Sequence, residues 1–504
     1  MTKGKRIIAV LLSAVFVIAL AACQKTGSTG SKRDSVVIAI SQDPKTFDML
    51  YAQSMLEGEM GFNIYDNLLF FEEDGTIRPF LAEAYEISPD GLTYTFKLRK
   101  GVKFHNGEEM KASDVLFTIE YGKDCPNSSE FCNLVKSMQI VDDYTLKLTV
   151  EYPTANFLLQ LCCDQFPIYS EKAVKSVTTY GQNPIGTGAY KFVSHDAGTK
   201  LEFEAFQDYF LGAPPIKRLI YKVLPDPFTA GVALETGDVD LIWSSTAATI
   251  ATLKQNKDLV IKADPSIRVN FVSMNNEVKP FSDVRIRRAV NYAIDRQAIV
   301  DIVDEGMSNP VNFMAMPWMA GYAAPDTRYS VDLDKAKSLM REAGYSQTNP
   351  LNVTLICVTT AQKVASVIQE NLREIGINVT LDLVEFNTYI DSLYNGNYQM
   401  AISGYYMVYK DMNMMTQFYL SDMIDYGNSA RYVNPAADAL LKKGDAELVP
   451  SKRVVIYKEF MDIVQNDAVY AVYGNPNTIR AHHKDLNIKK VYSNGIYVAD
   501  MEWK

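Results

Sequence analysis

The chain has 504 residues, with 50 Lys and Arg against 60 Asp and Glu, a formal net charge of −10, and 47% hydrophobic residues. This composition excludes an intrinsically disordered protein, and the length indicates several domains with a core large enough to need no cross-links. The acidic balance and the lack of any clustered stripe of Lys and Arg exclude a nucleic-acid partner, because phosphate binding needs concentrated positive charge.

The N-terminus has the pattern of a lipoprotein signal. Three basic residues precede Ile7–Leu20, an almost wholly apolar run that is too short to span a membrane as a helix. Two alanines and then Cys23 follow this run, which resembles the bacterial lipobox, where cleavage before the cysteine precedes its lipidation. We predict a signal peptide over residues 1–22 and lipid on Cys23; a plain signal peptide with a chance cysteine is the alternative.

The mature chain is predicted to lie outside the cytoplasmic membrane. Residues 23–35 are rich in Gly, Ser, Thr and Lys, as expected of a flexible tether between the lipid and the folded body. No later segment has 18 consecutive apolar residues, so only the lipid would hold the protein to the membrane, in the periplasm or at the cell surface.

Five further cysteines remain, an odd number that cannot all pair. Cys125 and Cys132 are close enough in sequence to close a small loop in an oxidising compartment. A disulfide between them and two ordinary thiols are both compatible with the sequence.

The first half of the chain alternates short strands with a helix. Val36–Ile40 is an apolar strand, and Thr93–Arg99 and Tyr144–Val150 alternate apolar with polar residues at the period of a half-buried strand. Ser113 and Asp114 are expected to cap an amphipathic helix between the last two strands. Residues 77–186 are therefore predicted to form a mixed α+β subdomain.

Two later regions have the pattern of strand–helix–strand units. In the first, a strand from Leu219, a helix opened by Pro227 and a strand at 239–242 follow one another. In the second, three strands beginning at Leu351, Ile377 and Tyr398 are separated by helical spacing, which predicts βαβαβ with a largely parallel sheet. The fold class is therefore α/β with two lobes.

Aromatic residues follow the carboxyl ends of strands in both units. Ligands of open α/β sheets bind beyond these ends, which here are Trp243 to Ser245 and Gly404 to Tyr406. If the two lobes face each other, these residues become opposite walls of a ligand cleft.

Met400–Tyr432 is unusually rich in Met and Tyr. It holds six of the chain's 20 methionines and six of its 30 tyrosines. Both residue types suit a pocket for varied ligands, and both also pack ordinary cores. A copper(I) site at Met412, Met414 and Met415 is a weaker alternative.

Enzyme motifs are missing from the sequence. It has no Gly-x-Ser-x-Gly, His-Glu-x-x-His, phosphate-loop or dinucleotide-binding pattern. His482 and His483 are adjacent, so in a strand they point to opposite faces and make a poor metal pair. We expect no enzyme activity, cofactor or metal, although a carboxylate pair of a secreted hydrolase is not visible to sequence alone.

Four stretches of the chain form recognisable motifs: LAEAYEISPDGLTYTFKLRKGVKFHNGEE (81–109) followed by ASDV (112–115), NPIGTGAY (183–190), PFSDVRIRRAVNYAIDR (280–296) and AKSLMREAG (336–344). They resemble family 5 of the bacterial extracellular solute-binding proteins, the peptide- and nickel-type receptors of ABC importers. The resemblance covers essentially the whole mature chain. It implies a two-lobed, hinge-closing periplasmic-binding-protein fold of type II with an additional subdomain.

The resemblance also implies a domain order and partners. Lobe I is expected over 36–76, 187–274 and 486–504, the additional subdomain over 77–186, and lobe II over 275–485. The chain would cross between the lobes in the strand Ile267 to Met274 and near Ala481 to Leu486, and closure would bend there. An oligopeptide or another small solute would be the ligand, a membrane permease with its ATPase the partner, and a monomer the expected state.

Peptide-binding family members carry a Gly-Trp-x-x-Asp pattern whose aspartate holds the peptide's amino terminus. Here the positions read Gly404-Tyr405-Tyr406-Met407-Val408, so Val408 stands where the aspartate is expected. No arginine for a dipeptide carboxylate is evident near 358–363. Asp411 lies nearby and is expected to bind a cationic group instead.

The predicted ligand-binding residues therefore come from both lobes. Trp243, Gly404, Tyr405, Tyr406, Tyr409 and Asp411 form the main set, and Phe47, Tyr51 and Tyr473 are additional wall candidates. The alternatives are a receptor of the same importer class for a metal complex, sugar or opine-like solute, a secreted hydrolase, and a sensor.

Overall fold

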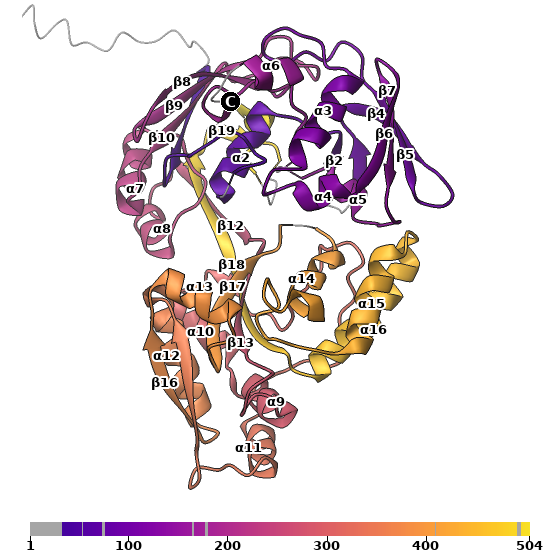
Figure 1. Cartoon of the computed structure of the whole chain (residues 1–504). Coiled ribbons are helices and arrows are strands. Elements are labelled where there is room, and N and C mark those ends of the chain that lie inside the picture. The colour runs from indigo at the N-terminus through magenta and orange to yellow at the C-terminus, as the bar shows by residue number, and fades with distance from the viewer. Residues whose placement is uncertain are drawn as a thin grey trace, which may run out of the picture.

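A computed structural model describes residues 33–52, 54–72, 76–163, 166–176, 180–408, 410–490 and 495–504. The predicted signal peptide and Cys23 lie outside these ranges, as does Tyr409. The chain forms two lobes, one above the other in Figure 1, which are joined at the level of β12, β13 and β18. The expected two-lobed α/β architecture is confirmed.

One twelve-stranded sheet runs through both lobes. Its order is β16-β15-β17-β13-β18-β11-β1-β10-β9-β8, and β12 and β14 pair with β18 outside this path. The strands are β1 (Ser35–Ile40), β8 (Tyr190–Asp196), β9 (Lys200–Ala205), β10 (Arg218–Val223), β11 (Leu241–Ile242), β12 (Leu259–Pro265), β13 (Arg268–Met274), β14 (Ser308–Asn309), β15 (Leu351–Cys357), β16 (Ile377–Leu383), β17 (Met400–Tyr406) and β18 (Tyr470–His483).

Lobe I contains β1 and β8 to β12, in which β1 lies between β10 and β11 and runs parallel to both. Its other elements are α2 (Met55–Ile64), β2 (Leu69–Phe71), β3 (Ile77–Pro79), α7 (Pro227–Thr236), α8 (Ala247–Leu253), β19 (Leu486–Ile488), η5 (Val498–Asp500) and β20 (Met501–Trp503). Helix α7 begins as expected: Pro227 is in its first turn, Asp226 caps it, and Gly237 ends it with a φ of 78°.

The additional subdomain has its own antiparallel sheet in the order β4-β5-β7-β6. Its elements are β4 (Ala82–Ile87), β5 (Thr93–Leu98), α3 (Ala112–Gly122), α4 (Ser129–Leu134), β6 (Val135–Asp142), β7 (Thr145–Val150), α5 (Phe157–Gln160), α6 (Glu171–Ser176) and η1 (Tyr180–Gln182). Its apolar side chains belong to the same buried cluster as those of lobe I. The subdomain is therefore an extension of the lobe I core.

Lobe II contains the predicted βαβαβ unit. β15 lies between β16 and β17 and is parallel to both. The helices are α9 (Val284–Ala293), α10 (Arg296–Val303), α11 (Leu333–Glu342), η2 (Thr359–Ala361), α12 (Gln362–Arg373), α13 (Phe386–Tyr394), η3 (Met412–Met414), α14 (Met415–Tyr419), η4 (Ser421–Met423), α15 (Pro435–Ala446) and α16 (Pro450–Asn466). Two separate apolar cores, one with α9 and α12 and one with α14 to α16, pack against β13 and its neighbours.

The chain crosses between the lobes at positions different from those predicted. β13 pairs along its length with β17, so it belongs to lobe II and the first crossing lies at Ser266–Ile267. β18 pairs with β13 as far as Gly474 and with β12 from Asn477 onward, so the return lies near Asn475 and not at 481–486. The amide of Asn475 donates hydrogen bonds to the carbonyls of Ser266 and Arg268, at 2.8 and 2.6 Å, and ties the two crossings together.

Two of the sequence motifs pack against each other in lobe I. His105, from the first motif, contacts Gly186 and Gly188, from the second. Its Nδ1 accepts the Gly186 N–H at 3.2 Å, and its Nε2 lies 2.9 Å from the Gly188 carbonyl oxygen. The neutral imidazole with its proton on Nε2 satisfies both contacts, and burial lowers the pKa of His105 to about 4.

His105 should make the protein sensitive to acid. The unfolded chain takes up a proton near the ordinary histidine pKa of 6.5, whereas the folded protein does so only near 4. The neutral His105 therefore makes its full contribution to the free energy of unfolding above about pH 6.5. The free energy of unfolding falls by roughly 2 to 3 kcal/mol as the pH decreases from there to 4. We expect urea unfolding of His105→Gln to show a smaller loss between pH 7.5 and 4.5 than the wild type; equal losses would contradict the assignment.

Within the described residues, no helix is both long and apolar enough to cross a bilayer.

Candidate functional site in the interlobe cleft

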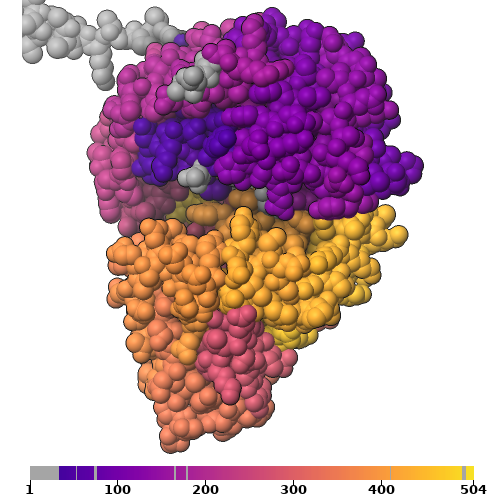
Figure 2. Space-filling view, viewed as in Figure 1, coloured from indigo at the N-terminus to yellow at the C-terminus, as the bar shows by residue number. Residues whose placement is uncertain are grey.

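A hollow separates the two lobes in the space-filling view of Figure 2, between the indigo-to-magenta upper part and the orange-to-yellow lower part. β15, β16 and β17 are parallel, and β17 meets β13 at the hinge through the pairing of Tyr406 with Arg268. Because the carboxyl ends of parallel strands share one edge of a sheet, the ends of these strands face the cleft.

β17 has a free edge at this end. It pairs with β13 from Met400 to Tyr406, but with β15 only at Met400 and Ala401. In the described part of the chain, the stretch after Ala401 therefore has a strand neighbour on one side only. The Ile402 carbonyl on this stretch accepts a hydrogen bond from the Tyr389 hydroxyl at 2.7 Å. The rest of such an edge presents backbone groups that can bind an extended ligand strand.

Gly404 lies on this edge and makes room for Arg268. A Cβ atom at Gly404 would stand 2.5 Å from both Arg268 Nη2 and Asn270 Oδ1. Arg268 Nε donates to Asn270 Oδ1 at 2.9 Å. The guanidinium group thus occupies the space that a side chain at position 404 would fill.

Tyr405 and Tyr406 have different environments, because adjacent strand residues point to opposite faces. Tyr405 is half-buried, accepts a hydrogen bond from the Gln417 amide at 2.8 Å and packs edge-on against Phe418. Tyr406 is 40% exposed, and its ring centroid is 5.1 Å from the Arg268 guanidinium carbon. Of the two, Tyr406 is the one presented for stacking.

Two further tyrosines surround Arg268. Burial raises the pKa of Tyr389 to about 12, and the rise is opposed by its Ser403 contact and by the nearby Arg268 guanidinium. Burial also raises the pKa of Tyr473, and Arg268 is the strongest opposing influence. Tyr473 is 4% exposed, so it supports the site from the sheet and does not form a wall.

Trp243, the residue predicted for the lobe I side of the cleft, is 6% exposed and belongs to the lobe I core. It follows β11, is largely buried and lies under the guanidinium of Arg480, 4.8 Å from its ring centroid. Arg480 in turn contacts the carboxylate of Asp264. Trp243 is therefore held by a paired cation, and Ser244 beside it is exposed.

The two candidates after the first strand differ. Phe47 is 2% exposed and packs between Phe192 and Phe203, so it belongs to the core and the expectation of a wall position is wrong. Tyr51 is 44% exposed and packs against Tyr121. Tyr51 remains a candidate.

Asp411 is not available to a ligand in this structure. Its side chain is fully buried, and both carboxylate oxygens accept hydrogen bonds from Arg453, each at 2.7 Å. It also accepts the backbone N–H of Asn413 at 2.7 Å and thereby caps η3. The predicted role in binding a cationic group is therefore replaced by a buried ion pair.

The lobes also touch on the side away from β12, β13 and β18, the strands at which they are joined. On this side α15 approaches the additional subdomain in Figure 1. Asp445 Oδ1 accepts hydrogen bonds from Thr154 Oγ1 at 2.9 Å and from the Asn413 amide at 2.8 Å. Its backbone carbonyl accepts the Ala155 N–H at 3.0 Å. Because Asn413 also bonds to Asp411, the buried ion pair supports this interlobe contact.

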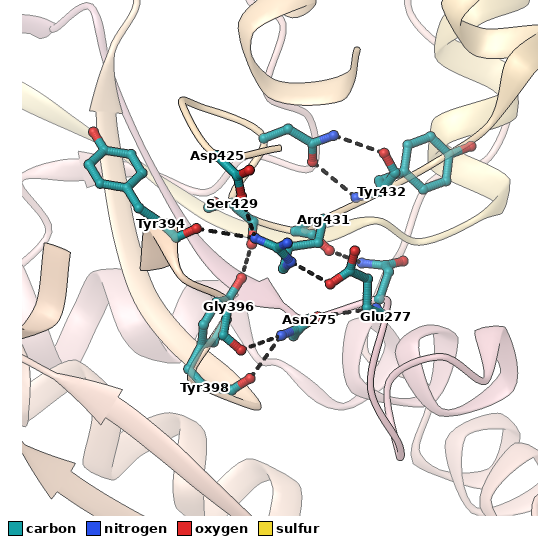
Figure 3. Close-up of polar contacts among 12 residues, drawn as sticks. Asn275, Glu277, Tyr394, Gly396, Tyr398, Asp425, Ser429, Arg431 and Tyr432 are labelled. Atoms are coloured by element: carbon teal, nitrogen blue, oxygen red, sulfur yellow. Dashed lines mark hydrogen bonds and ion pairs between the residues drawn. The ribbon is translucent and has the colours of Figure 1, made fainter. Parts of the chain in front are cut away.

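A polar cluster at the other end of β13 fixes the segment that carries Tyr426. Figure 3 shows Arg431 contacting Glu277, Asp425 and the Tyr394 carbonyl, and the Asn275 amide donating to the carbonyls of Gly396 and Tyr398. Every charged group drawn there has an oppositely charged partner. The cluster therefore stabilises lobe II and is not a ligand site.

The Met-rich segment mainly fills the core. Met407, Met412, Met414 and Met415 are at most 2% exposed and belong to one apolar cluster. These four methionines therefore pack the core of lobe II and do not line a pocket. Among the described residues, no group of three or more His, Cys, Asp or Glu side chains is arranged to hold a metal.

Cys125 and Cys132 are free, buried thiols, so the disulfide is not formed. The Cys125 thiol instead donates to the Tyr121 carbonyl at 3.2 Å. Burial raises the pKa of both thiols, which keeps them protonated and unreactive.

Sequence reasoning missed Arg268, Asn270 and Tyr389. The predicted strand Ile267 to Met274 did contain a signal, because Arg268 and Asn270 occupy alternate positions at its start. Two polar residues on one face of an otherwise apolar strand indicate that this face is no longer covered by the core at that end of the strand.

Comparison with known proteins places the chain in a family. Residues 76–426 match the model of the bacterial extracellular solute-binding proteins, family 5 (Middle). The chain is 30% identical to heme-binding protein A of Haemophilus influenzae, over 91% of this chain and 92% of that protein, and 28% identical to the glutathione-binding protein GsiB of Salmonella paratyphi A, over 90% and 91%.

A solved structure agrees. The periplasmic binding protein DppA of Helicobacter pylori in complex with the peptide STSA is 26% identical, covers 94% of this chain and 98% of its own, and superposes with a TM-score of 0.77. Members of the family are extracytoplasmic binding proteins of ABC transporters and not enzymes, and they bind peptides or small solutes and work with permease components. The chain belongs to family 5 of the bacterial extracellular solute-binding proteins and is the substrate-binding protein of an ABC importer.

Proposed function

We propose that this protein is a lipid-anchored receptor that captures a peptide or peptide-like solute in the interlobe cleft and delivers it to its permease and ATPase. Cys23 carries the lipid, and the folded body acts as a monomer at the extracytoplasmic face of the membrane. The tether over 23–35 gives it the reach to meet the permease.

The free edge of β17 beyond Ala401 is the observation that carries the peptide part of the proposal. A peptide in extended conformation can add to such an edge through its main chain, which gives affinity for many sequences. Tyr406 beside this edge offers a stacking surface. The DppA of Helicobacter pylori, whose structure contains a peptide, is consistent with this use of the cleft.

One observation favours a second candidate. Asp411 is already paired with Arg453, and Val408 stands where peptide-binding relatives carry an aspartate, so no charge for a peptide amino terminus is present at these two positions. A non-peptide solute, such as the heme that one relative is named for, is the alternative.

Native mass spectrometry on the fragment that starts after Cys23 tests the proposal. Protein as purified is compared with protein refolded from denaturant, and any bound molecule is released and identified. We expect a series of peptides of defined length and variable sequence. A single non-peptide species would replace the peptide by that solute, and no ligand together with no thermal shift across peptides, glutathione and heme would contradict capture in the cleft.

A further inference from the structure

Arg268 lies at the hinge end of the cleft on a backbone that is held in place. Its N–H donates to Ser266 Oγ at 3.1 Å, and its carbonyl accepts from the Asn475 amide at 2.6 Å. The residue starts β13 opposite Tyr406, the last residue of β17. Its side chain is half-buried, so it is partly removed from water and still accessible.

In the part of the chain that the structure describes, no carboxylate pairs with the guanidinium group of Arg268. Only Nε has a hydrogen-bond acceptor, Asn270 Oδ1, and within the described residues neither Nη1 nor Nη2 has a hydrogen-bond or ion-pair partner. Two other arginines of the chain are different: Arg453 pairs with Asp411, and Arg480 contacts Asp264.

A partly desolvated cation without a partner is unfavourable, and an anion placed against it restores the lost interaction. The planar guanidinium group matches a carboxylate, which it binds through two parallel N–H···O bonds. The guanidinium group fills the space over Gly404, in the strand whose edge is free for a ligand backbone. Tyr406 lies against the group and limits its motion.

We propose that Arg268 anchors a free carboxylate of the cargo, so that the cleft selects carboxylate-bearing solutes. This rests on the proposed capture of ligand in the cleft and names the chemistry that the site recognises. No arginine that could bind a dipeptide carboxylate is present near 358–363. Arg268 would bind the carboxylate instead, from β13 at the hinge side of the cleft.

Isothermal titration of the fragment that starts after Cys23 tests the proposal. The probes are tri- to pentapeptides with a free carboxyl terminus, the same peptides as C-terminal amides, glutathione and heme. We expect the wild type to bind the free acids about tenfold or more tightly than the amides, as a charge-assisted pair requires. Arg268→Gln should bind both forms with the amide's affinity, and Arg268→Lys should retain part of the preference, because it keeps the charge without the bidentate geometry.

Arg341→Gln is the matched control, since Arg341 is exposed at the end of α11, far from the cleft in Figure 1, and it should behave as the wild type. Equal binding of acids and amides by the wild type overturns the role of Arg268 and leaves peptide capture intact. Binding of heme alone, lost in Arg268→Gln, supports Arg268 and overturns the peptide. Binding of glutathione alone, lost in Arg268→Gln, supports Arg268 and narrows the peptide cargo to that tripeptide. If the wild type binds none of the probes, both the capture of ligand in the cleft and the role of Arg268 are overturned. This outcome is measured on the wild type alone and does not depend on whether a variant folds.

Discussion

Asp411→Asn and Arg453→Met are each expected to destabilise the protein by about 3 to 5 kcal/mol, measured as the free energy of unfolding in urea. The reason is that each change leaves one charged partner in a buried site with nothing to compensate it. Asp411 is fully buried, and both of its oxygens bind the guanidinium group of Arg453. The interlobe contact of Asp445 should weaken as well, because Asn413 connects it to Asp411.

Asp425→Asn provides the control for this pair. Asp425 contacts Arg431 at 3.1 Å, but its side chain is 82% exposed, so water screens the interaction and the loss should be at most about 1 kcal/mol. A folded Asp411→Asn protein of unchanged stability that no longer binds ligand would show that Asp411 serves the ligand, as its sequence position suggested. Unchanged affinity with reduced stability would confirm the structural role.

Gly186→Ala and Gly188→Ala should each cost about 3 kcal/mol or more, because the new methyl group meets main-chain atoms that cannot move aside. A Cβ at Gly186 would stand 2.0 Å from the Ile64 carbonyl oxygen, and one at Gly188 would stand 2.4 Å from the Ile64 carbonyl carbon. Ile64 is the last residue of α2, and its carbonyl accepts the Gly188 N–H at 2.9 Å. Thermal or urea unfolding of each variant measures the loss.

Gly61→Ala separates this effect from a general intolerance of α2 to alanine. A Cβ there would approach only the flexible side chain of Met49, and alanine is favoured over glycine inside a helix by roughly 0.5 to 1 kcal/mol. We expect its stability to stay close to that of the wild type. Losses of equal size in all three variants would refute the backbone-contact explanation.

The same contacts explain two of the motifs that carry the family resemblance. The motif at 183–190 supplies glycines where only a bare backbone fits against α2, and the motif at 81–109 supplies the His105 that hydrogen-bonds to that backbone. Both motifs therefore contribute to the packing of lobe I.

Local sequence patterns predicted many of the strands and helices of both lobes, with bounds close to those observed. The strands β1, β5, β7 and β15 to β17 and the helices α7 and α12 follow from periods of two or near 3.6 residues and from local caps such as Asp226 and Gly237. These signals are local, since each depends on neighbours within one element. α3 shows the limit of this approach: its cap is at Lys111, and Asp114, predicted as a cap, lies in the first turn and accepts the Lys111 N–H.

Which candidate residues are open to a ligand depends on contacts between distant parts of the chain. The local sequence around Asp411 predicts a ligand-binding charge, but Arg453 of α16 pairs with it in the folded protein. Arg268 meets Gly404 only through the pairing of β13 with β17, so no local pattern joins these two residues. The crossing at Asn475 depended in the same way on where β18 changes partners. Burial and charge compensation are properties of contacts between distant parts of the chain. Local patterns of residues therefore predict candidate ligand-binding residues, and tertiary contacts determine which of them are accessible and uncompensated.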